Sequence, residues 1–452
     1  MSSRPSFLTR CRQRLLLPAV VTWMVLTGTN LFAQVVAGNF GAVGGVMINA
    51  DGFLAKATRD AIGDLQKLRA DALRDMPEGM NRTAGLRKVS LAGLEREVQK
   101  CIESGKPLPP AVQCLAGLQQ VRYVLVYPEE KDIVLVGPAE GWNVDDRGAF
   151  VGANSGRPVM LLDDLVVALR ASGGPTRTVM ACSIDPTPEG IQRLRAASRR
   201  ASPDPRIAVP AMEEQLGPQK ITIHGLPETS HFAQVMVAAD YRMKRVSLAL
   251  DPSPVAGLPS FLEMAKAGRG VHSTLPRWWL EPSYEPLVRD EQGLAWELRG
   301  AKVKTMTEND FFDANGIQRP TGQADPVAQR WADMMTERYE DLSKADPIFG
   351  QLRNCMDLAV VAALMMKENL TAKAGNALPL LTGKGGLETA RLAAPKQVAT
   401  QAVPFRKSNR WLVAAGGVQI NPWAIVEKAQ TSDAVAAVHK TSAAKRTNWW
   451  WD

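Results

Sequence analysis

The spacing of apolar residues in the central part of the chain alternates between the patterns of strands and helices. Two apolar runs, 122–127 and 132–136, are joined by Pro128 and three charged residues, and this arrangement predicts a β-hairpin. Apolar residues recur at helical spacing over 159–171, and a pair of glycines follows, which favours the end of a helix there.

Strands and helices then alternate over the next residues. The apolar runs predict strands at 179–184, 221–224 and 246–250. A helix is expected after Thr187, because Thr suits an N-cap, Pro188 suits the first helical position and Glu189 is favourable near a helix N-terminus. A second helix is expected over about 230–242. This alternation predicts layers of sheet and helix.

Helical patterns flank this region, together with shorter extended runs. Helices are predicted at 54–74, 90–103 and 111–118, after a Gly-rich strand at 44–49. Short strands are predicted at 278–280, 295–298 and 303–306, and a strand pair is predicted over 410–420 around Gly416 and Gly417. Residues 325–370 are helical, and the apolar run 355–366 predicts a buried core helix because it is too short to cross a bilayer.

These elements predict an α+β protein with a mixed α/β core of alternating strands and helices, N-terminal helices and a C-terminal helical pair. The expected organisation is a signal peptide (1–33), an N-terminal strand plus helical segment (34–120), the mixed core (121–310), a helical region (311–370) and a basic, partly disordered C-terminal region (371–452).

The first 33 residues have the order of a secretory signal peptide. Four arginines precede an apolar run at 15–32, which contains Pro18, and small residues follow. Cleavage fits after Ala33 or after Ala37, and the alternative is an uncleaved anchor, which needs about 20 apolar residues. We expect an exported protein, periplasmic or extracellular, with no transmembrane span once the signal is removed.

Charge is distributed unevenly along the chain. The formal net charge is +8, and removal of the four arginines of the signal segment leaves +4. Residues 371–452 carry 11 Lys or Arg against 4 Asp or Glu, so the body before them is slightly acidic. The basic balance therefore belongs to the C-terminal region, which we expect to contact an acidic envelope polymer or a protein partner. An exported protein rarely meets nucleic acid, so we expect no nucleic-acid partner.

Cysteines of an exported chain meet an oxidising compartment, where disulfides form. Cys101 and Cys114 flank a turn rich in Gly and Pro, and a bridge there would close a loop of about 15 residues, worth roughly 3 kcal/mol. Free thiols are the alternative. Cys182 and Cys355 lie in apolar runs that suit buried free thiols equally well.

Several enzyme motifs are missing from the sequence: His-Glu-x-x-His, Cys-x-x-Cys, Gly-x-Ser-x-Gly and a phosphate-binding loop. We therefore predict no metal site, and the sequence does not identify a cofactor. The best constellation is His224 at the end of a predicted strand, Glu228, His231 at the start of the next helix, and Asp240 farther along it. Imidazoles and carboxylates could bind a metal or move a proton. The alternative is capping and packing around the helix start.

A second candidate is an aromatic and acidic stretch formed by Trp278, Trp279, Glu281 and Tyr284. Aromatic rings beside acids could stack on a sugar or a peptide, and half-buried packing is the alternative. Near the chain terminus, Trp449–Trp451 could touch a membrane interface or a partner groove, or form a frayed end. The Gly-started segments 44–49 and 416–421 are also similar, by chance or as similar strand-helix units.

Several ordered strings carry a family resemblance. They are Gly-Pro-Ala-Glu-Gly-Trp at 137–142, Gly-Arg-Pro at 156–158 with 162–170, 183–190, 230–235 with 239–244, and Pro-Arg-Trp-Trp at 276–279. They resemble an uncharacterised secreted family of planctomycete bacteria, a domain of unknown function (DUF1598), over about Val121 to Leu364. The resemblance implies export and a bacterial envelope setting, and it implies no catalytic residues.

Two hypotheses about function follow. The first is a non-catalytic binding or structural protein of the bacterial cell envelope. The second is a hydrolase or metal-dependent enzyme with a site around His224 and His231.

Overall fold

The computed structural model describes residues 42–49, 51–56, 70, 76–200, 202, 204–267, 276–312, 318–383, 386–400, 402–405, 410–442 and 449–452. All of them belong to one compact unit, residues 32–452. The signal segment, both predicted cleavage sites and most of the helix predicted at 54–74 lie outside the described residues. The described start of that predicted helix is instead a strand, β3.

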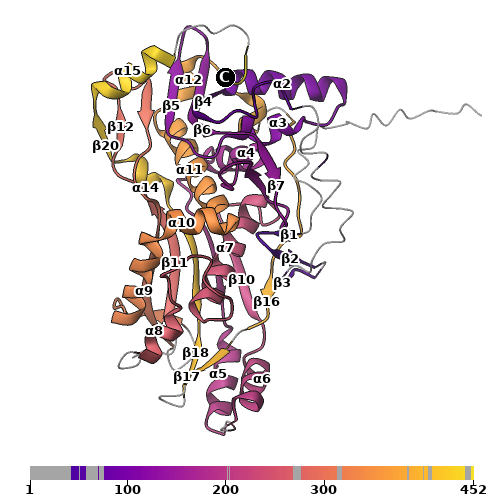
Figure 1. The fold of residues 1–452 in the computed structure, drawn as a ribbon, viewed down its shortest axis with the longest axis vertical. Helices are drawn as coiled ribbons and strands as arrows, with labels where there is room; N and C mark the ends of the chain where they lie inside the picture. The colour runs from indigo at the N-terminus through magenta and orange to yellow at the C-terminus, as the bar shows by residue number, and fades with distance from the viewer. Residues whose placement is uncertain are drawn as a thin grey trace, which may run out of the picture. The chain divides into compact units, whose positions relative to one another are not determined.

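Among the described residues, ten strands form the larger sheet (Figure 1). In spatial order they are β1 (Ala42–Val43), β2 (Val46–Ile48), β3 (Phe53–Lys56), β16 (Gln397–Val398), β10 (Gln219–His224), β9 (Met180–Asp185), β19 (Ala415–Ile420), β11 (Pro276–Ser283), β14 (Lys302–Phe312) and β15 (Gln318–Pro320). The sheet is mixed, since β9 is antiparallel to β10 and β19, whereas β19 is parallel to β11.

A second sheet has six strands among the described residues. In spatial order they are β20 (Ala429–Thr431), β12 (Leu287–Arg289), β13 (Ala295–Glu297), β5 (Tyr123–Tyr127), β6 (Asp132–Ala139) and β4 (Ala84–Ser90). β5 and β6 form the predicted hairpin. Two further pairs are β7 (Trp142–Val144) with β8 (Phe150–Gly152), and β17 (Ala402–Phe405) with β18 (Arg410–Val413).

Helices surround and separate the sheets. They are α2 (Leu91–Ser104), α3 (Pro110–Gln113), the 3-10 turn η1 (Leu115–Gly117), α4 (Leu162–Ser172), α5 (Pro188–Ser198), α6 (Pro205–Leu216), α7 (His231–Ser247), α8 (Phe261–Ala267), α9 (Pro326–Glu337), α10 (Tyr339–Ala345), α11 (Pro347–Lys367), α12 (Leu370–Ala374), α13 (Pro379–Thr382), α14 (Pro422–Val426) and α15 (Asp433–Ser442). The α+β class predicted from the sequence is confirmed.

Local capping explains where two central helices begin. Thr187 is the N-cap of α5, and its hydroxyl accepts a hydrogen bond from the Gly190 amide at 3.1 Å, as predicted. Ser230 caps α7 in the same way through the Ala233 amide, at 3.2 Å. Both caps satisfy amides that the first helical turn leaves free, so the helix starts follow from the sequence.

The core is built around α11, which packs against α4, α7, α10 and α14. Within the described part of the chain, α11 is the one helix long and apolar enough to cross a bilayer, and its apolar stretch is entirely buried inside the protein. The buried core helix predicted at 355–366 is therefore confirmed. Its Leu, Val and Met side chains are buried on nearly all sides of the helix and belong to the main hydrophobic core.

Two strand predictions are wrong. Residues 246 and 247 belong to the last turn of α7, not to a strand, because Val246 is buried three residues after Met243 and continues the packed side of that helix. The pair predicted over 410–420 is also wrong, since β18 pairs with β17. Gly416 and Gly417 lie inside β19 instead of in a turn.

The two glycines of β19 allow close strand packing. A Cβ on Gly416 would collide with the carbonyl oxygen of Trp278, and one on Gly417 would collide with that of Cys182. Gly416 also has a φ of 134°, which favours glycine. The similar segment 44–49 is different, because Gly44 and Gly45 form the turn between β1 and β2, and β3 follows. The similarity between the segments is therefore not structural.

The C-terminal region contributes ordered elements to both sheets. β19 and β16 belong to the larger sheet, β20 belongs to the smaller one, and α15 packs on β12 and β13. The described residues of 371–452 thus contribute strands and helices to the fold. Composition does not reveal that β19 is inserted between two strands distant in sequence, and the partial disorder expected for this region stays a prediction.

The predicted disulfide is not formed. The four cysteines among the described residues are free thiols. Cys101 is half-buried on the last turn of α2, whereas Cys114 is completely buried beyond α3, so the two thiols lie in different surroundings. Burial raises the pKa of Cys114 far above its usual value, which keeps the thiol protonated and unreactive.

Candidate functional site

The four residues of the predicted histidine site lie in different surroundings. His224, at the end of β10, and Glu228, in the following turn, are exposed. His231 and Asp240, both on α7, are buried and contact other partners. The structure therefore does not bring these four side chains together as one catalytic centre.

His231 forms a pair with a carboxylate that the sequence did not connect to it. Its Nδ1 lies 3.0 Å from both carboxylate oxygens of Asp164 on α4. Burial lowers the pKa of His231, but the two adjacent carboxylates outweigh it and raise the value overall. Burial and the charge of Asp164 raise the pKa of neighbouring Asp163 to about 7. Asp163 therefore exchanges its proton near neutral pH.

The His231–Asp164 pair borders a small cavity. Gln351 and Asn354 of α11 also line it, together with three apolar side chains. The space available to the centre of a water molecule is about 10 Å³, enough for about one water. Such a cavity is too small for an organic substrate. The pair can therefore orient a water molecule, but it does not face a substrate pocket in this structure.

Asp240 has a structural role. Its carboxylate accepts a hydrogen bond from Lys244 Nζ at 2.9 Å, and Lys244 also donates to the carbonyls of Ile184 at 2.7 Å and Gly416 at 3.3 Å. Burial raises the pKa of Asp240 to about 6, and the Lys244 ammonium opposes this change. The pair fastens α7 to the ends of β9 and β19.

The predicted aromatic site is divided by the alternation of β11. Trp278 is fully buried and makes edge contacts with Phe261 and Trp331. Tyr284 donates a hydrogen bond to the buried Asp357 at 2.6 Å. Trp279 and Glu281 lie on the opposite face of the sheet and are only half-buried. The hydroxyl of the half-buried Tyr284 is already bound to Asp357, so Trp279 and Glu281 are the two predicted residues that remain candidates for a ligand surface.

Strand register places Trp279 and His224 on the same face of the larger sheet. Thr222 pairs with Ser183, Ser183 with Gly417, Gly417 with Trp279, and Trp279 with Met306. The next row contains His224 opposite Ala181, Ala181 opposite Gln419, and Glu281 opposite Lys304. We call these two rows the Trp279 face. Thr222 and Trp279 are three strands apart, roughly 14 Å.

The side chains of the Trp279 face are half-buried or exposed apart from Gly417, which is buried and has no side chain. The opposite face holds Cys182, Val418 and Trp278 in the main core, where α7 covers β9 and β19. The two candidate sites identified separately in the sequence therefore contribute to one surface, because pairing over four strands brings them together.

Polar contacts hold the ring of Trp279 in place. Its Nε1 donates to Glu281 at 3.1 Å, and the guanidinium of Arg277 lies 5.5 Å from the ring centroid. Glu281 is also paired with Lys304 at 2.8 Å. The ring is thus bordered by a cation and a carboxylate. This is the chemistry of a platform that stacks on a ring-shaped, hydroxyl-bearing ligand and offers hydrogen bonds at its edge.

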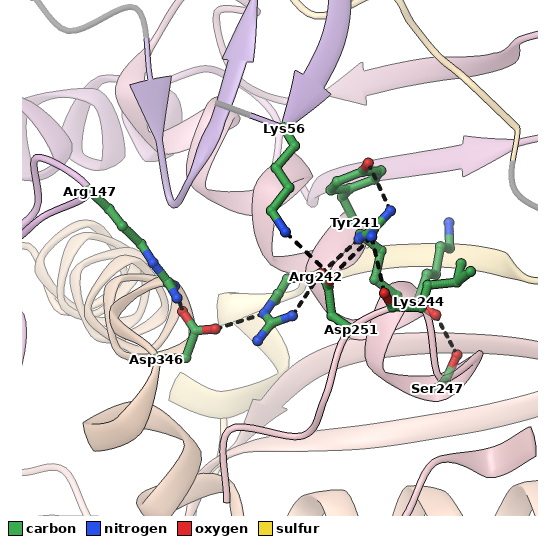
Figure 2. A network of polar contacts seen from close by, with 10 residues as sticks. Lys56, Arg147, Tyr241, Arg242, Lys244, Ser247, Asp251 and Asp346 are labelled. Atoms are coloured by element: carbon green, nitrogen blue, oxygen red, sulfur yellow. Dashed lines mark hydrogen bonds and ion pairs between the residues drawn. The ribbon is translucent and has the colours of Figure 1, made fainter. Parts of the chain in front are cut away.

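A further charged network lies around the end of α7 (Figure 2). Arg242 donates to Asp346 at 2.7 Å and to Asp251 at 2.8 Å, and Arg245 also donates to Asp251. Lys56 of β3 and Arg147 after β7 complete the network. Hydrogen bonds from Arg245 lower the pKa of Asp251 to about 2. The network joins four segments that are distant in the sequence, and it was not identified from the sequence.

Among the described residues, no group of three or more His, Cys, Asp or Glu side chains could hold a metal ion.

The comparisons with known proteins agree with part of the resemblance seen in the sequence. A model of a protein family of unknown function (DUF1598) matches residues 182–261, which run from β9 to the start of α8. No curated protein and no solved structure matches the chain. The matched segment includes Ser183, Thr222 and His224 of the Trp279 face, and all of α7. Residues 182–261 are therefore similar to DUF1598, a domain of unknown function.

Proposed function

We propose that this chain is an exported, non-catalytic binding protein of the bacterial cell envelope, and that its ligand surface is the Trp279 face. The observation that carries the proposal is the strand register, which joins Trp279 and Glu281 to Ser183, Thr222 and His224 in two adjacent rows. Export rests on the signal-like order of the first 33 residues.

The chemistry of the surface favours a hydroxyl-rich polymer such as an envelope polysaccharide. A Trp ring offers a large apolar face to one side of a sugar ring. Glu281, Gln419 and His224 supply hydrogen-bond acceptors and donors in the adjacent row of the same face. Basic residues of 371–452 would add a contact to an acidic polymer or a protein partner.

Trp279→Ala tests the proposal. Purified polysaccharides (cellulose, chitin and xylan) and isolated peptidoglycan are tested for retention of the protein by affinity gel electrophoresis or co-sedimentation. We expect retention by at least one of them, and we expect the substitution to weaken it about tenfold, the equivalent of about 1.4 kcal/mol.

Trp423→Ala is the matched control. Trp423 on α14 is also half-buried and also lies beside an arginine, Arg177, at 5.4 Å, but it is not part of the Trp279 face. Its replacement should leave retention unchanged. Equal weakening by both substitutions, or wild-type retention after loss of Trp279, would contradict the proposed surface.

A further inference from the structure

The segment Trp449–Asp452, at the C-terminus marked in Figure 1, pairs antiparallel with β4, the edge strand of the six-stranded sheet, through a bridge between Trp451 and Val89. The amide of Asp452 donates to the carbonyl of Lys88 at 3.0 Å, and the Lys88 amide donates back at 3.3 Å. The Ser90 amide donates to Trp450 at 2.9 Å. An edge strand leaves such groups unpaired, so the segment satisfies what β4 would otherwise expose.

The side chains of β4 complement those of the segment. Arg87 is buried, and its guanidinium lies 5.4 Å from the ring centroid of Trp451. The Arg87 guanidinium also donates hydrogen bonds to the carbonyls of Met80 and Ala116, and the Trp451 ring contacts it in addition to these partners. Lys88 and Asp452 form an ion pair. The site therefore selects an aromatic residue followed by an acid.

A glycine provides the room for this contact. A Cβ on Gly93, in the first turn of α2, would lie 2.5 Å from the carbonyl oxygen of Trp449 and 2.6 Å from Cα of Trp450. These distances are too short for non-bonded atoms, so a Cβ at this position would displace the backbone of the segment. Gly93 is inside a helix, where Ala would be the more favourable residue, so the glycine is explained by the docked segment and not by the helix.

We propose that the edge of β4 is a strand-binding site that takes Trp449–Asp452 of a second copy of this chain in place of its own. The contacts arise from these four residues together with β4 and α2, so they are the same whether the segment comes from its own chain or from another. A short connection raises the local concentration of the chain's own segment, which favours the closed monomer in dilute solution. Exchange then joins copies as their concentration rises.

Two full-length variants separate donor from acceptor. Gly93→Ala blocks the acceptor and leaves the segment intact. The double substitution Trp450→Ala and Trp451→Ala removes the segment's aromatic contacts and leaves the acceptor intact. We expect each variant alone to be monomeric by light scattering, and a 1:1 mixture at tens of micromolar to contain a heterodimer.

A charge exchange sharpens the test. Lys88→Glu, added to the Trp450→Ala/Trp451→Ala chain that keeps its acceptor site, should weaken the heterodimer about fivefold. Asp452→Lys, added to the Gly93→Ala chain that supplies the segment, should restore it. Circular dichroism confirms that each variant is folded, and α2 should tolerate Gly93→Ala. Folded variants that give no heterodimer when mixed would overturn the proposal. So would dimers in either variant alone, or a heterodimer that is insensitive to the charge exchange.

Discussion

Trp278 and Trp279 are neighbours in the chain but lie on opposite faces of the larger sheet. Trp278 is completely buried between Phe261 of α8 and Trp331 of α9. Trp279 is half-buried and contacts polar partners. The comparison shows that an aromatic cluster in a sequence is not one site when it lies on a strand, because alternate residues belong to different faces.

Two ion pairs of β14 differ in the same way, because one is buried in the core and the other is not. At the start of β14, Lys302 and Asp357 are paired at 2.9 Å with side chains 4% and 0% exposed. On the Trp279 face, Lys304 and Glu281 are paired at 2.8 Å with side chains 37% and 25% exposed. The two pairs have nearly the same N–O distance but very different exposure to solvent. Breaking the buried pair should therefore cost more stability than breaking the half-buried one.

The largest expected effect separates the two tryptophans. Trp278→Ala should lower the free energy of unfolding by about 3–5 kcal/mol, because it leaves a cavity in the core. Trp279→Ala should lower it by less than about 1 kcal/mol. Urea unfolding of both variants measures this difference, and equal losses would contradict the assignment of the two faces.

The next effect concerns the two ion pairs. Lys302→Met should cost about 3 kcal/mol of stability, because it leaves the buried carboxylate of Asp357 without its cation. Lys304→Met is the matched change on the Trp279 face and should cost about 0.5 kcal/mol or less. A loss after Lys304→Met as large as after Lys302→Met would show that the Lys304–Glu281 pair is as closed to solvent as the Lys302–Asp357 pair.

A pH effect distinguishes the buried carboxylate cluster from the rest of the core. The pKa of Asp163 is raised to about 7 by burial and by Asp164, so the folded protein binds this proton more tightly than the unfolded chain does. The stabilisation of the folded state by this bound proton is present at low pH and is lost as pH rises from about 4 through about 7. Asp163→Asn should therefore make the loss of stability over this pH interval smaller by up to about 4 kcal/mol. Urea unfolding at several pH values measures it, and unchanged slopes would contradict the assignment.

The smallest effect has the opposite sign. Hydrogen bonds from Arg245 lower the pKa of Asp251 to about 2, so its contribution is present above about pH 4 and is lost as pH falls through about 2. Asp251→Asn should cost about 1 kcal/mol at neutral pH and less in acid. Asp341→Asn, which removes a weak exposed contact with Arg338 at 3.8 Å, should change little. The free energy of unfolding is measured between acid and neutral pH. If it rises as much in the Asp251→Asn variant as in the wild type, this account is refuted.

Features that depend on neighbouring residues could be predicted from the sequence. The β5–β6 hairpin, the Thr187 cap and the buried core helix α11 each depend on a turn, a cap or an apolar run within one short segment. The strand predicted at 246–250 failed because residues 246 and 247 continue the buried side of α7, and packing outweighs β propensity there.

The candidate site was predicted only in part. His224, Trp279 and Glu281 were identified, but as members of two separate groups, and each group included buried residues such as Asp240 and Trp278. The pairing of His231 with Asp164 was missed because 67 residues separate them. No short spacing in the chain reports such a contact.

The sequence by itself determined the α+β class, the starts of α5 and α7 and the acid–aromatic character of β11, because caps and apolar spacing act over a few residues. Only the tertiary structure decided that β19 joins β9 to β11 and so unites His224 with Trp279 on one surface. It also decided that Trp449–Asp452 covers β4. Strand register and edge pairing depend on contacts between segments that are distant in the sequence, and no short stretch of sequence specifies which strands pair.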